Sequence, residues 1–294
     1  MRTAVAVDLG GTAIKSARCD ARGRLTNRRE VPTPKGRSAI LKTIIKEIEA
    51  HLPASAIGLG TPGLVDAQGR VMGGCPNIPG WSGTQIGKAL RRRFRLTVRV
   101  GNDANLAALG ECAYGAGKGA KSLVLVTLGT GIGSGIVLDG KLFPGGRSLG
   151  AEIGHATIDV HGRECGCGGR GCFERHASAS AILQNYGKNS IRDVREVFKR
   201  ARGGDRKAKR AVADGLEALG LGLAGIINTF NPEVLLLGGG MSRIPGVVSA
   251  ASRIARKRAI PVCSRGVRIA AARLGNDAGL AGAGRLALSS MPTH

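Results

Sequence analysis

Four side chains that bind transition metals lie close together in the middle of the chain. His155 is followed by Cys165, Cys167 and Cys172, so three thiols fall within eight residues of a glycine-rich stretch. One imidazole and three thiolates are the ligand set of a closed tetrahedral zinc site, which leaves no open position for an activated water. Without a metal, clustered thiols would be open to oxidation. These residues therefore predict a structural zinc site rather than three ordinary small residues.

Three glycine turns follow apolar runs and could hold phosphate groups, at 8–12 (DLGGT), 127–131 (TLGTG) and 238–242 (GGGMS). Without a Cβ atom in the way, the backbone N–H groups of such a turn can approach anionic oxygens. In the first turn, the Asp8 carboxylate could hold Mg²⁺ directly or through water, and the Thr12 hydroxyl could donate to phosphate. A turn without a ligand is the alternative for each one. No Walker motif or dinucleotide fingerprint is present.

A carboxylate that could act as a general base follows a predicted strand at 98–100. Phosphoryl transfer to a hydroxyl needs a phosphate cradle, magnesium and a carboxylate that accepts the hydroxyl proton. Asp103 is the candidate, because it lies between this strand and a predicted helix. The residues alone leave an alternative open, in which Asp103 or the neighbouring Asn102 is simply the N-cap of that helix.

The elements that must position these residues alternate between strands and helices, which predicts an α/β fold. Residues 7–12 (VDLGGT) are repeated as VTLGTG at 126–131, an offset of 119 residues, which indicates two related lobes. We expect a small lobe at 1–117, completed by a C-terminal helix at about 277–294, and a large lobe at 118–276 with a zinc loop at 143–174. The patterns predict strands at 4–7, 13–18, 56–59, 98–100, 123–126, 132–138 and 234–237, a helix at 40–52, and a buried helix at 218–230.

The charge balance is strongly basic, with 44 Lys and Arg against 20 Asp and Glu, or +24 over 294 residues. A hydrophobic content of 43% excludes a disordered polycation, and an aromatic content of 3% disfavours platforms for stacked nucleobases. Basic residues gather at 91–99, 192–210 and 253–268, which can indicate a polyanion partner or simply solvated helix surfaces. Seven cysteines without a disulfide pattern, and an acid at position 8 in place of an export signal, predict a cytoplasmic protein without a membrane partner.

Seven motifs, in this order, resemble the ROK family of sugar kinases and repressors, and the resemblance covers nearly the whole chain. They are DLGGT at 8–12, TPGLVD at 61–66, GNDAN at 101–105, LGTGIG at 128–133, EIGH at 152–155, CGCGGRGCFE at 165–174 and LGNDAG at 274–279. The resemblance implies the actin-like ATPase (ribonuclease H-like) fold, with two lobes and a cleft between them. It also implies ATP-dependent phosphorylation of a hexose at its 6-hydroxyl. We expect no helix-turn-helix domain of the repressors ahead of Asp8.

The resemblance also implies a role for individual residues. Asp103 would be the general base, and structural Zn²⁺ and Mg²⁺ with ATP would be the cofactors. The sugar would be bound by Asn77, Asn102, Asp103, Glu152, His155 and Glu174; the nucleotide and its phosphates by Asp8, Gly10, Gly11, Thr12, Gly129, Thr130, Gly131, Gly239 and Gly240; and zinc by His155, Cys165, Cys167 and Cys172.

The motifs do not fix the substrates, although glucose is favoured. N-Acetylglucosamine and N-acetylmannosamine kinases of the family share nearly all of them, and another hexose is a further alternative. Inorganic polyphosphate is an alternative donor, and a polyanion- or nucleic-acid-binding regulator is the alternative of another class, although nucleic acid is the weaker prediction. Many members have lysine where this chain has Ala13, and Lys15 could supply that charge. Family members are commonly homodimers or homotetramers.

Overall fold

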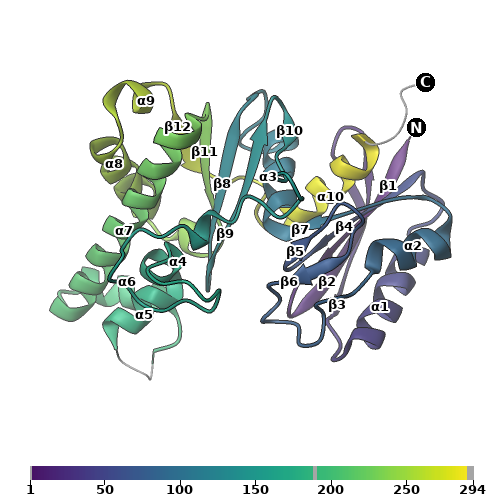
Figure 1. Cartoon of the computed structure of the whole chain (residues 1–294), viewed down its shortest axis with the longest axis horizontal. Coiled ribbons are helices and arrows are strands. Elements are labelled where there is room, and N and C mark those ends of the chain that lie inside the picture. Colours follow the sequence, from purple (N-terminus) through teal and green to yellow (C-terminus); the bar gives the residue numbers. More distant parts are fainter. Residues whose placement is uncertain (1, 188–190, 290–294) are drawn as a thin grey trace. The chain divides into compact units, whose positions relative to one another are not determined.

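The structure, a computed structural model, describes residues 2–187 and 191–289 (Figure 1). Its contacts divide the chain into two compact units. Unit 1 comprises the chain up to Gly119, residues 135–151 and the chain from Leu274, and unit 2 comprises residues 120–134 and 152–273. Compared with the lobes expected from the sequence, residues 135–151 go with the first unit, because Gly135 packs against Ala104 and Ala108 of the helix that begins at Asp103.

Unit 1 is built on a five-stranded sheet with the order β3-β2-β1-β4-β7. The central strand β1 runs antiparallel to β2 and parallel to β4, and β4 is parallel to β7. After β4 in the chain, β5 and β6 pair with each other in a small antiparallel hairpin. The elements are β1 (Thr3–Leu9), β2 (Ala13–Asp20), β3 (Leu25–Pro32), α1 (Arg37–Glu49), β4 (Ala56–Thr61), β5 (Leu64–Val65), β6 (Val71–Gly73), α2 (Ile86–Phe94), β7 (Thr97–Asn102), α3 (Asp103–Tyr114) and α10 (Ala278–Ser289).

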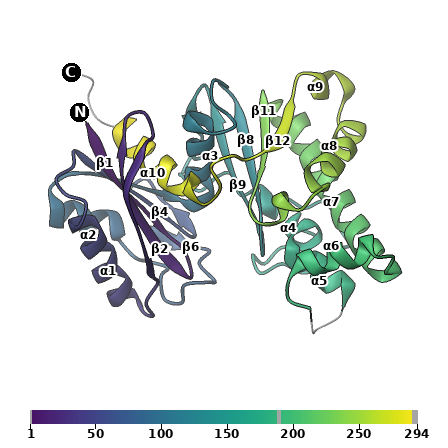
Figure 2. The same cartoon turned by 180° about the vertical axis from the view of Figure 1, so that it is seen from behind.

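The two faces of this sheet differ in the size of their side chains. On one face, Val5 and Val7 of β1 join the core made with α1 and α2. On the other face, Ala4 and Ala6 meet α10, which lies along the sheet together with α3 (Figure 2). Because side chains alternate along a strand, a valine–alanine alternation gives one thick hydrophobic layer and one face where helices can approach closely.

Unit 2 contains the second sheet, whose order β10-β9-β8-β11-β12 matches that of the first. Its β8 and β9 flank the repeated glycine turn, and β11 runs parallel to both β8 and β12. The sheets therefore share one strand order, as expected from the repeat. The elements are β8 (Leu123–Leu128), β9 (Ile132–Leu138), β10 (Lys141–Leu142), η1 (Ile153–His155), α4 (Glu174–Ala177), α5 (Ala179–Tyr186), α6 (Val194–Arg202), α7 (Arg206–Phe230), β11 (Val234–Gly238), η2 (Met241–Arg243), α8 (Val247–Arg258), α9 (Pro261–Arg265), β12 (Arg268–Ala271) and η3 (Gly275–Asp277); β10, η3 and the later part of β9 go with unit 1.

The apolar stretch at 218–230 is the second half of α7, a helix of 25 residues. Among the described residues, α7 is the one helix whose length and composition would allow it to cross a membrane. However, 56% of its most apolar 18-residue window is buried in the protein. It packs against α4, α5, α6 and α8 of its own unit. We therefore describe it as the core helix of unit 2.

Elements with weak sequence patterns were missed. The edge strand β3 is exposed along most of its length, so its sequence LTNRREVP carries no alternation of apolar and polar residues. The helix expected at 40–52 ends at Glu49, ahead of Pro53, because the residue before a proline is disfavoured in helical conformation.

Replacing glycine by alanine should have opposite effects on stability at two helical positions, one in the close contact between α3 and α10 and one on the surface of α7. A Cβ atom at Gly282 would lie 1.7 Å from the backbone oxygen of Leu106, whereas a Cβ at the exposed Gly225 of α7 would meet nothing within 4 Å. Gly282→Ala should lower the free energy of unfolding by about 1–3 kcal/mol or more through overpacking. Gly225→Ala should raise it by roughly 0.5–1 kcal/mol, because alanine is the better helix former. Urea unfolding of both variants measures this, and an unchanged midpoint for Gly282→Ala would contradict the packing described.

Candidate functional site

Two carboxylates are brought to one edge of the unit 1 sheet. In the register of the parallel strands, Asp8 of β1 is paired with Gly60 of β4, and Gly60 with Gly101 of β7. Asp103 follows directly as the first residue of α3. Ligands of open α/β sheets bind outside the carboxyl ends of parallel strands, and both aspartates lie at that edge.

Asp8 sits in a space that only glycines leave open. A Cβ atom at Gly279, in the first turn of α10, would lie 2.8 Å from Asp8 Oδ2, and one at Gly60 would lie 3.2 Å from Oδ1. The pKa of Asp8 is raised to about 6, chiefly by burial and also by the neighbouring Asp103, against the opposing effect of Lys15. Lys15 is paired with Asp8 across β1 and β2, so it supplies positive charge at this carboxylate.

Asp103 is not the N-cap of its helix. That position belongs to Asn102, whose side chain accepts a hydrogen bond from the Asn105 N–H at 3.1 Å and donates to the Gly63 carbonyl at 3.1 Å. The Asp103 carboxylate accepts one from the Ala104 N–H at 2.8 Å. Burial raises the pKa of Asp103 above its usual value. Asn102 is thus the N-cap, and the role of Asp103 as a general base stays a prediction.

The first glycine turn is held by a residue that the sequence did not point to. Thr33 donates from its hydroxyl to the Gly10 carbonyl at 2.7 Å, and its N–H donates to the Thr12 carbonyl at 2.9 Å. Asn77 lies against the same turn, because a Cβ atom at Gly11 would lie 3.0 Å from the Asn77 Cβ. The structure therefore brings a predicted sugar-binding residue to a predicted phosphate turn.

The second and third glycine turns meet within unit 2. Gly129 N–H donates to the Gly131 carbonyl at 3.0 Å, which closes the turn around Thr130. Gly239 has a φ of 81°, and a Cβ atom there would lie 2.4 Å from the Leu128 carbonyl oxygen. Both the left-handed backbone and this close approach require glycine.

A cavity of about 1050 Å³ opens between these two turns. Gly129, Thr130 and Gly240, three of the residues predicted to bind the nucleotide, line it. The rest of its wall was missed by the sequence analysis, because these residues come from α5, α6, η2 and the segments next to them and belong to no recognisable motif. Among them are Ala179, Leu183, Arg192, Arg202, Arg243 and Ile244.

The backbone of Ile132 joins the other predicted residues of unit 2. Its N–H donates to Glu174 Oε2 at 2.8 Å. Its carbonyl faces η1, where a Cβ atom at Gly154 would lie 2.1 Å from it. His155, which follows this glycine, Glu152, two residues before it, and the carboxylate of Glu174 are thereby held near the second glycine turn.

His155, Cys165, Cys167 and Cys172 form a cluster that could hold a metal ion. Their ligand atoms all lie within 4.8 Å of one another. Cys165 Sγ is 3.6 Å from His155 Nδ1, and Cys167 Sγ is 3.6 Å from Cys172 Sγ. Sulfur atoms at two corners of a tetrahedron around a metal with 2.3 Å bonds would be roughly 3.8 Å apart. Both the donor set and these spacings fit a four-coordinate metal.

The sites thus form two groups, one in each unit. Unit 1 holds Asp8, Gly10, Gly11, Thr12, Asn77, Asn102 and Asp103. Unit 2 holds the other two glycine turns, the metal cluster, Glu152 and Glu174.

The raised pKa of Asp8 predicts a pH-dependent gain in stability for Asp8→Asn. Because this pKa is about 6 in the folded protein and 3.8 ordinarily, ionisation costs stability, and the cost is absent below pH 3.8 and complete above pH 6. At pH 8, the free energy of unfolding of Asp8→Asn should therefore be higher than that of the parent protein by about 1–3 kcal/mol. The difference should vanish towards pH 4. Urea unfolding of both proteins across this range measures it. A difference that does not depend on pH would contradict the buried, repelled state of Asp8.

Comparison with known proteins identifies the family. The family model described as "ROK family" matches residues 4–290. A protein named glucokinase from Halalkalibacterium halodurans is 35% identical over 96% of this chain and 94% of its own. The structure of a ROK hexokinase from Thermus thermophilus matches with a TM-score of 0.89 and 36% identity, over 98% of both chains. The structure of a ROK glucokinase from Streptomyces griseus, in complex with glucose and AMPPNP, matches with a TM-score of 0.82 and 32% identity over 98% of this chain and 100% of that chain. The chain therefore belongs to the ROK family, and it has the actin-like ATPase fold of that family's sugar kinases.

Proposed function

We propose that the protein is a sugar kinase that transfers a phosphoryl group from ATP to the 6-hydroxyl of a hexose, with glucose as the favoured substrate. The observation that carries this proposal is the pair of carboxylates, Asp8 and Asp103, at the carboxyl ends of parallel strands beside a glycine turn. Its support comes from relatives of about one-third identity that are named glucokinase.

Asp103 is the general base of this reaction. It accepts the proton of the sugar 6-hydroxyl while that oxygen forms a bond to the terminal phosphorus of ATP, and the bond from this phosphorus to the bridging oxygen breaks to release ADP. The burial that raises the pKa of Asp103 makes it a stronger proton acceptor than an exposed aspartate. Its position at the start of α3, with the helix capped by Asn102, leaves the side chain for this role.

Asp8 and the glycine turns hold the donor. The residues present fit magnesium, because the buried Asp8 carboxylate lies near a second carboxylate, that of Asp103, which raises its pKa further. When bound, Mg²⁺ neutralises charge on the phosphates during the transfer. The first turn (Gly10, Gly11 and Thr12) and the cavity in unit 2 contact the nucleotide.

The sugar is recognised through its hydroxyl groups by Asn77, Asn102, Asp103, Glu152, His155 and Glu174. His155 can serve both the metal and the sugar, because Nδ1 faces the thiols and Nε2 is on the opposite side of the ring. In Glu174, Oε2 accepts from Ile132 and Oε1 is left for a hydroxyl. Paired hydroxyl contacts reject sugars that lack one of the groups.

The metal of the His–Cys cluster is a structural zinc ion. Three thiolates and one imidazole are the soft, four-coordinate set that zinc prefers. The ion joins η1, which carries His155, to the segment that ends at Glu174. It thereby fixes the loop from which Glu152, His155 and Glu174 reach the sugar.

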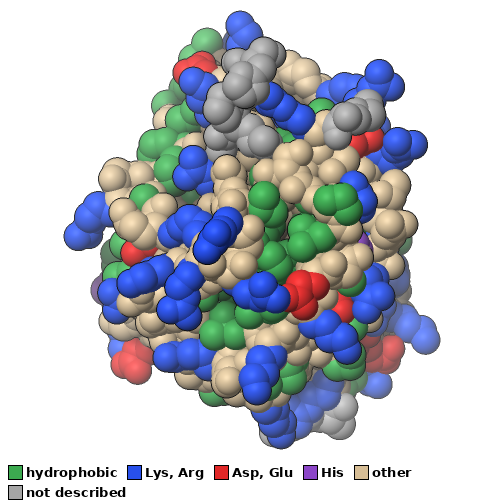
Figure 3. Space-filling view, turned by 90° about the vertical axis from the view of Figure 1, so that its right-hand side faces the viewer, with side chains coloured by type: hydrophobic (Ala, Val, Ile, Leu, Met, Phe, Trp, Pro, Cys, Tyr) green, Lys and Arg blue, Asp and Glu red, His purple; other side chains and the backbone are tan. Residues whose placement is uncertain are grey.

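The basic surface supports a second candidate only weakly. Figure 3 shows one face of the molecule on which Lys and Arg side chains are spread among other residues, with few acidic ones. Several surface arginines are already paired within the protein; Arg91 donates to the Gln68 carbonyl, and Arg93 forms an ion pair with Glu49. A polyanion-binding regulator is therefore the alternative function.

We further propose that the protein is a cytoplasmic homodimer or homotetramer and that polyphosphate is a second donor.

A coupled assay of the parent protein and Asp103→Asn tests the proposal. With ATP, glucose should give the highest kcat/KM in a panel with mannose, N-acetylglucosamine, N-acetylmannosamine and fructose. Asp103→Asn should lower kcat by about 10²–10⁴ and leave the Kd for the sugar nearly unchanged, since a general base acts on the chemical step. Near-normal turnover in Asp103→Asn would show that Asp103 is not the general base.

Higher activity on an N-acetylhexosamine would make that sugar, rather than glucose, the favoured substrate. Turnover of the nucleotide-free protein with polyphosphate would show that polyphosphate is a donor besides ATP.

Zinc removal should weaken both the fold and sugar binding. Freshly purified protein should contain about one zinc per chain. Cys167→Ser should lose the metal, lower the unfolding midpoint by roughly 5 °C and raise the KM for sugar, because the metal-pinned loop loosens. Cys263→Ser, a cysteine outside the cluster, is the matched control and should keep the zinc. Fresh protein without zinc would contradict the metal assignment.

A further inference from the structure

The protein has one tryptophan, Trp81, and its side chain is completely buried in the core of unit 1. A buried tryptophan usually donates its N–H group to a partner. Here Nε1 donates to the hydroxyl oxygen of Thr61 at 2.8 Å, and this hydroxyl in turn donates to the Pro62 carbonyl at 3.2 Å. Thr61 is also fully buried. The indole thus ties together two segments that lie 20 residues apart in the sequence.

Thr61 places this hydrogen bond beside two of the residues to which we assign sugar binding. It is the last residue of β4 and is paired with Asn102, the last residue of β7. Asp103 follows Asn102 directly and begins α3. The Asn102 amide also donates to the Gly63 carbonyl at 3.1 Å, so the chain just after Thr61 is tied to the same strand end. The Thr61 hydroxyl is therefore fixed with respect to both Asn102 and Asp103.

At the other end of the hydrogen bond, Trp81 is linked to Asn77 through two consecutive turns. The N–H of Trp81 donates to the Ile78 carbonyl at 3.2 Å, and the N–H of Ile78 donates to the Cys75 carbonyl at 3.1 Å. Bonds of this spacing close β-turns, so Asn77 is a central residue of the first turn and Trp81 is the last residue of the second. Ile78, which the turns share, is buried in the same core as Trp81. A shift of the indole would therefore move the backbone that carries Asn77.

The position of the Asn77 side chain depends on this backbone. The side chain is exposed, and its amide makes no hydrogen bond with any residue that the structure describes. Its Cβ lies against the first glycine turn, where a Cβ atom at Gly11 would be 3.0 Å away. A polar group binds a ligand well only when it is held within about 0.5 Å of the productive position. For Asn77, that restraint comes from the two turns and from the buried residues that anchor them.

We propose that Trp81 and Thr61 are positioning residues for sugar binding. Their hydrogen bond fixes Asn77 with respect to the sugar-binding residues at the start of α3. This role rests on the proposed function and adds to it two buried side chains that touch no substrate. A hexose presents its hydroxyl groups at fixed spacings on a ring, so the groups that bind it must be held at matching spacings. The indole–hydroxyl bond sets the spacing between the Asn77 amide and the Asn102–Asp103 pair.

The test measures the Kd for glucose by calorimetry on the full-length protein without ATP, so that it does not depend on turnover. Thr61→Val removes the acceptor with little change in size and should raise this Kd about three- to tenfold, because the indole N–H is left unpaired. Trp81→Phe removes the donor instead and should raise the Kd to a similar extent. Thr61→Ser keeps the hydroxyl and should restore the parent Kd.

The coupled assay separates positioning from catalysis. Thr61→Val should raise the KM for glucose by the same factor as the Kd. Its kcat and its KM for ATP should change by less than about twofold, because neither the general base nor the nucleotide cavity is altered. A fall in kcat with an unchanged KM for glucose would overturn the proposal.

Asn77→Ala tests whether the two positioning residues act through Asn77. By itself it should raise the Kd for glucose about tenfold, as expected for a lost hydrogen bond to a hydroxyl group. In the Asn77→Ala protein, adding Thr61→Val should have no further effect, because interacting residues are not additive. Additive effects would show that Thr61 acts by another route and would overturn the proposal. An unchanged Kd in Thr61→Val beside a raised Kd in Asn77→Ala would overturn this inference alone, whereas a parent protein that neither binds nor phosphorylates a hexose would overturn the proposed function.

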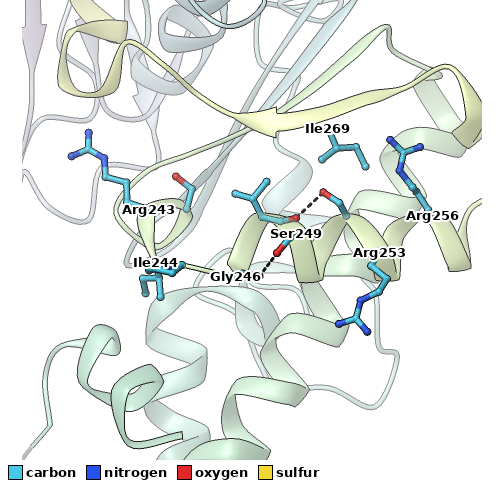
Figure 4. A pocket seen from close by; sticks show the side chains of 11 residues that line it. Arg243, Ile244, Gly246, Ser249, Arg253, Arg256 and Ile269 are labelled. Atoms are coloured by element: carbon cyan, nitrogen blue, oxygen red, sulfur yellow. Dashed lines mark hydrogen bonds between the residues drawn. The ribbon is translucent and has the colours of Figure 1, made fainter. Parts of the chain in front are cut away.

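Arg256→Gln is the matched control for a general loss of stability. Arg256 extends from α8 in unit 2 (Figure 4) and donates to the carbonyls of Ser264 and Val267 at 2.7 and 2.8 Å. It anchors a connecting segment by side-chain hydrogen bonds, as Trp81 does, but lies in the other unit from the Asn77 segment. Both Thr61→Val and Arg256→Gln should unfold at lower urea concentration, and only Thr61→Val should change the Kd for glucose. An equal rise of the Kd in Arg256→Gln would assign the effect to lost stability and overturn the proposal.

Discussion

The arrangement of unit 1 depends on keeping two like charges close together at the edge of one sheet. Asp8 and Asp103 are both partly buried, and their mutual repulsion adds to the cost of burial. Such a pair is tolerated because the surrounding backbone fixes it: Asp8 is the next-to-last residue of a central strand, and Asp103 begins a capped helix. A site that loses stability when both groups are ionised gains it back when a cation binds, which is how a metal–phosphate complex would be selected.

Small residues make this arrangement possible on the side of α10. The alternation of valine and alanine along β1, together with Gly58, Gly110 and Gly282, lets α3 and α10 approach the sheet and each other more closely than larger side chains would permit. Gly279 continues the same series and leaves room for the carboxylate of Asp8. The high glycine content of the chain, 48 residues, is thus partly a packing requirement and partly a requirement of the tight turns.

Unit 2 uses the same sheet order for a different purpose. Its repeated turn at Gly129–Gly131 is closed against the third glycine turn, and the Ile132 backbone next to it is the point at which Glu174 and η1 meet. The loop that carries these groups also contains the His155, Cys165, Cys167 and Cys172 cluster, which could hold a metal ion. The segment between β10 and α4 therefore carries most of the unit 2 side chains for which we propose a role in sugar recognition.

The sequence by itself determined the strands flanking the glycine turns, the metal-ligand set and the family, because short apolar runs, close-spaced thiols and motifs are local patterns. It did not reveal β3, whose exposed edge has no alternation, or Thr33, whose hydroxyl closes the first turn from 23 residues away. It also left the N-cap undecided between Asn102 and Asp103, and did not identify the arginines that line the cavity beside the second and third glycine turns. Only the tertiary structure decided these, because register between distant strands, burial and the pairing of each charge depend on contacts that a linear pattern does not contain.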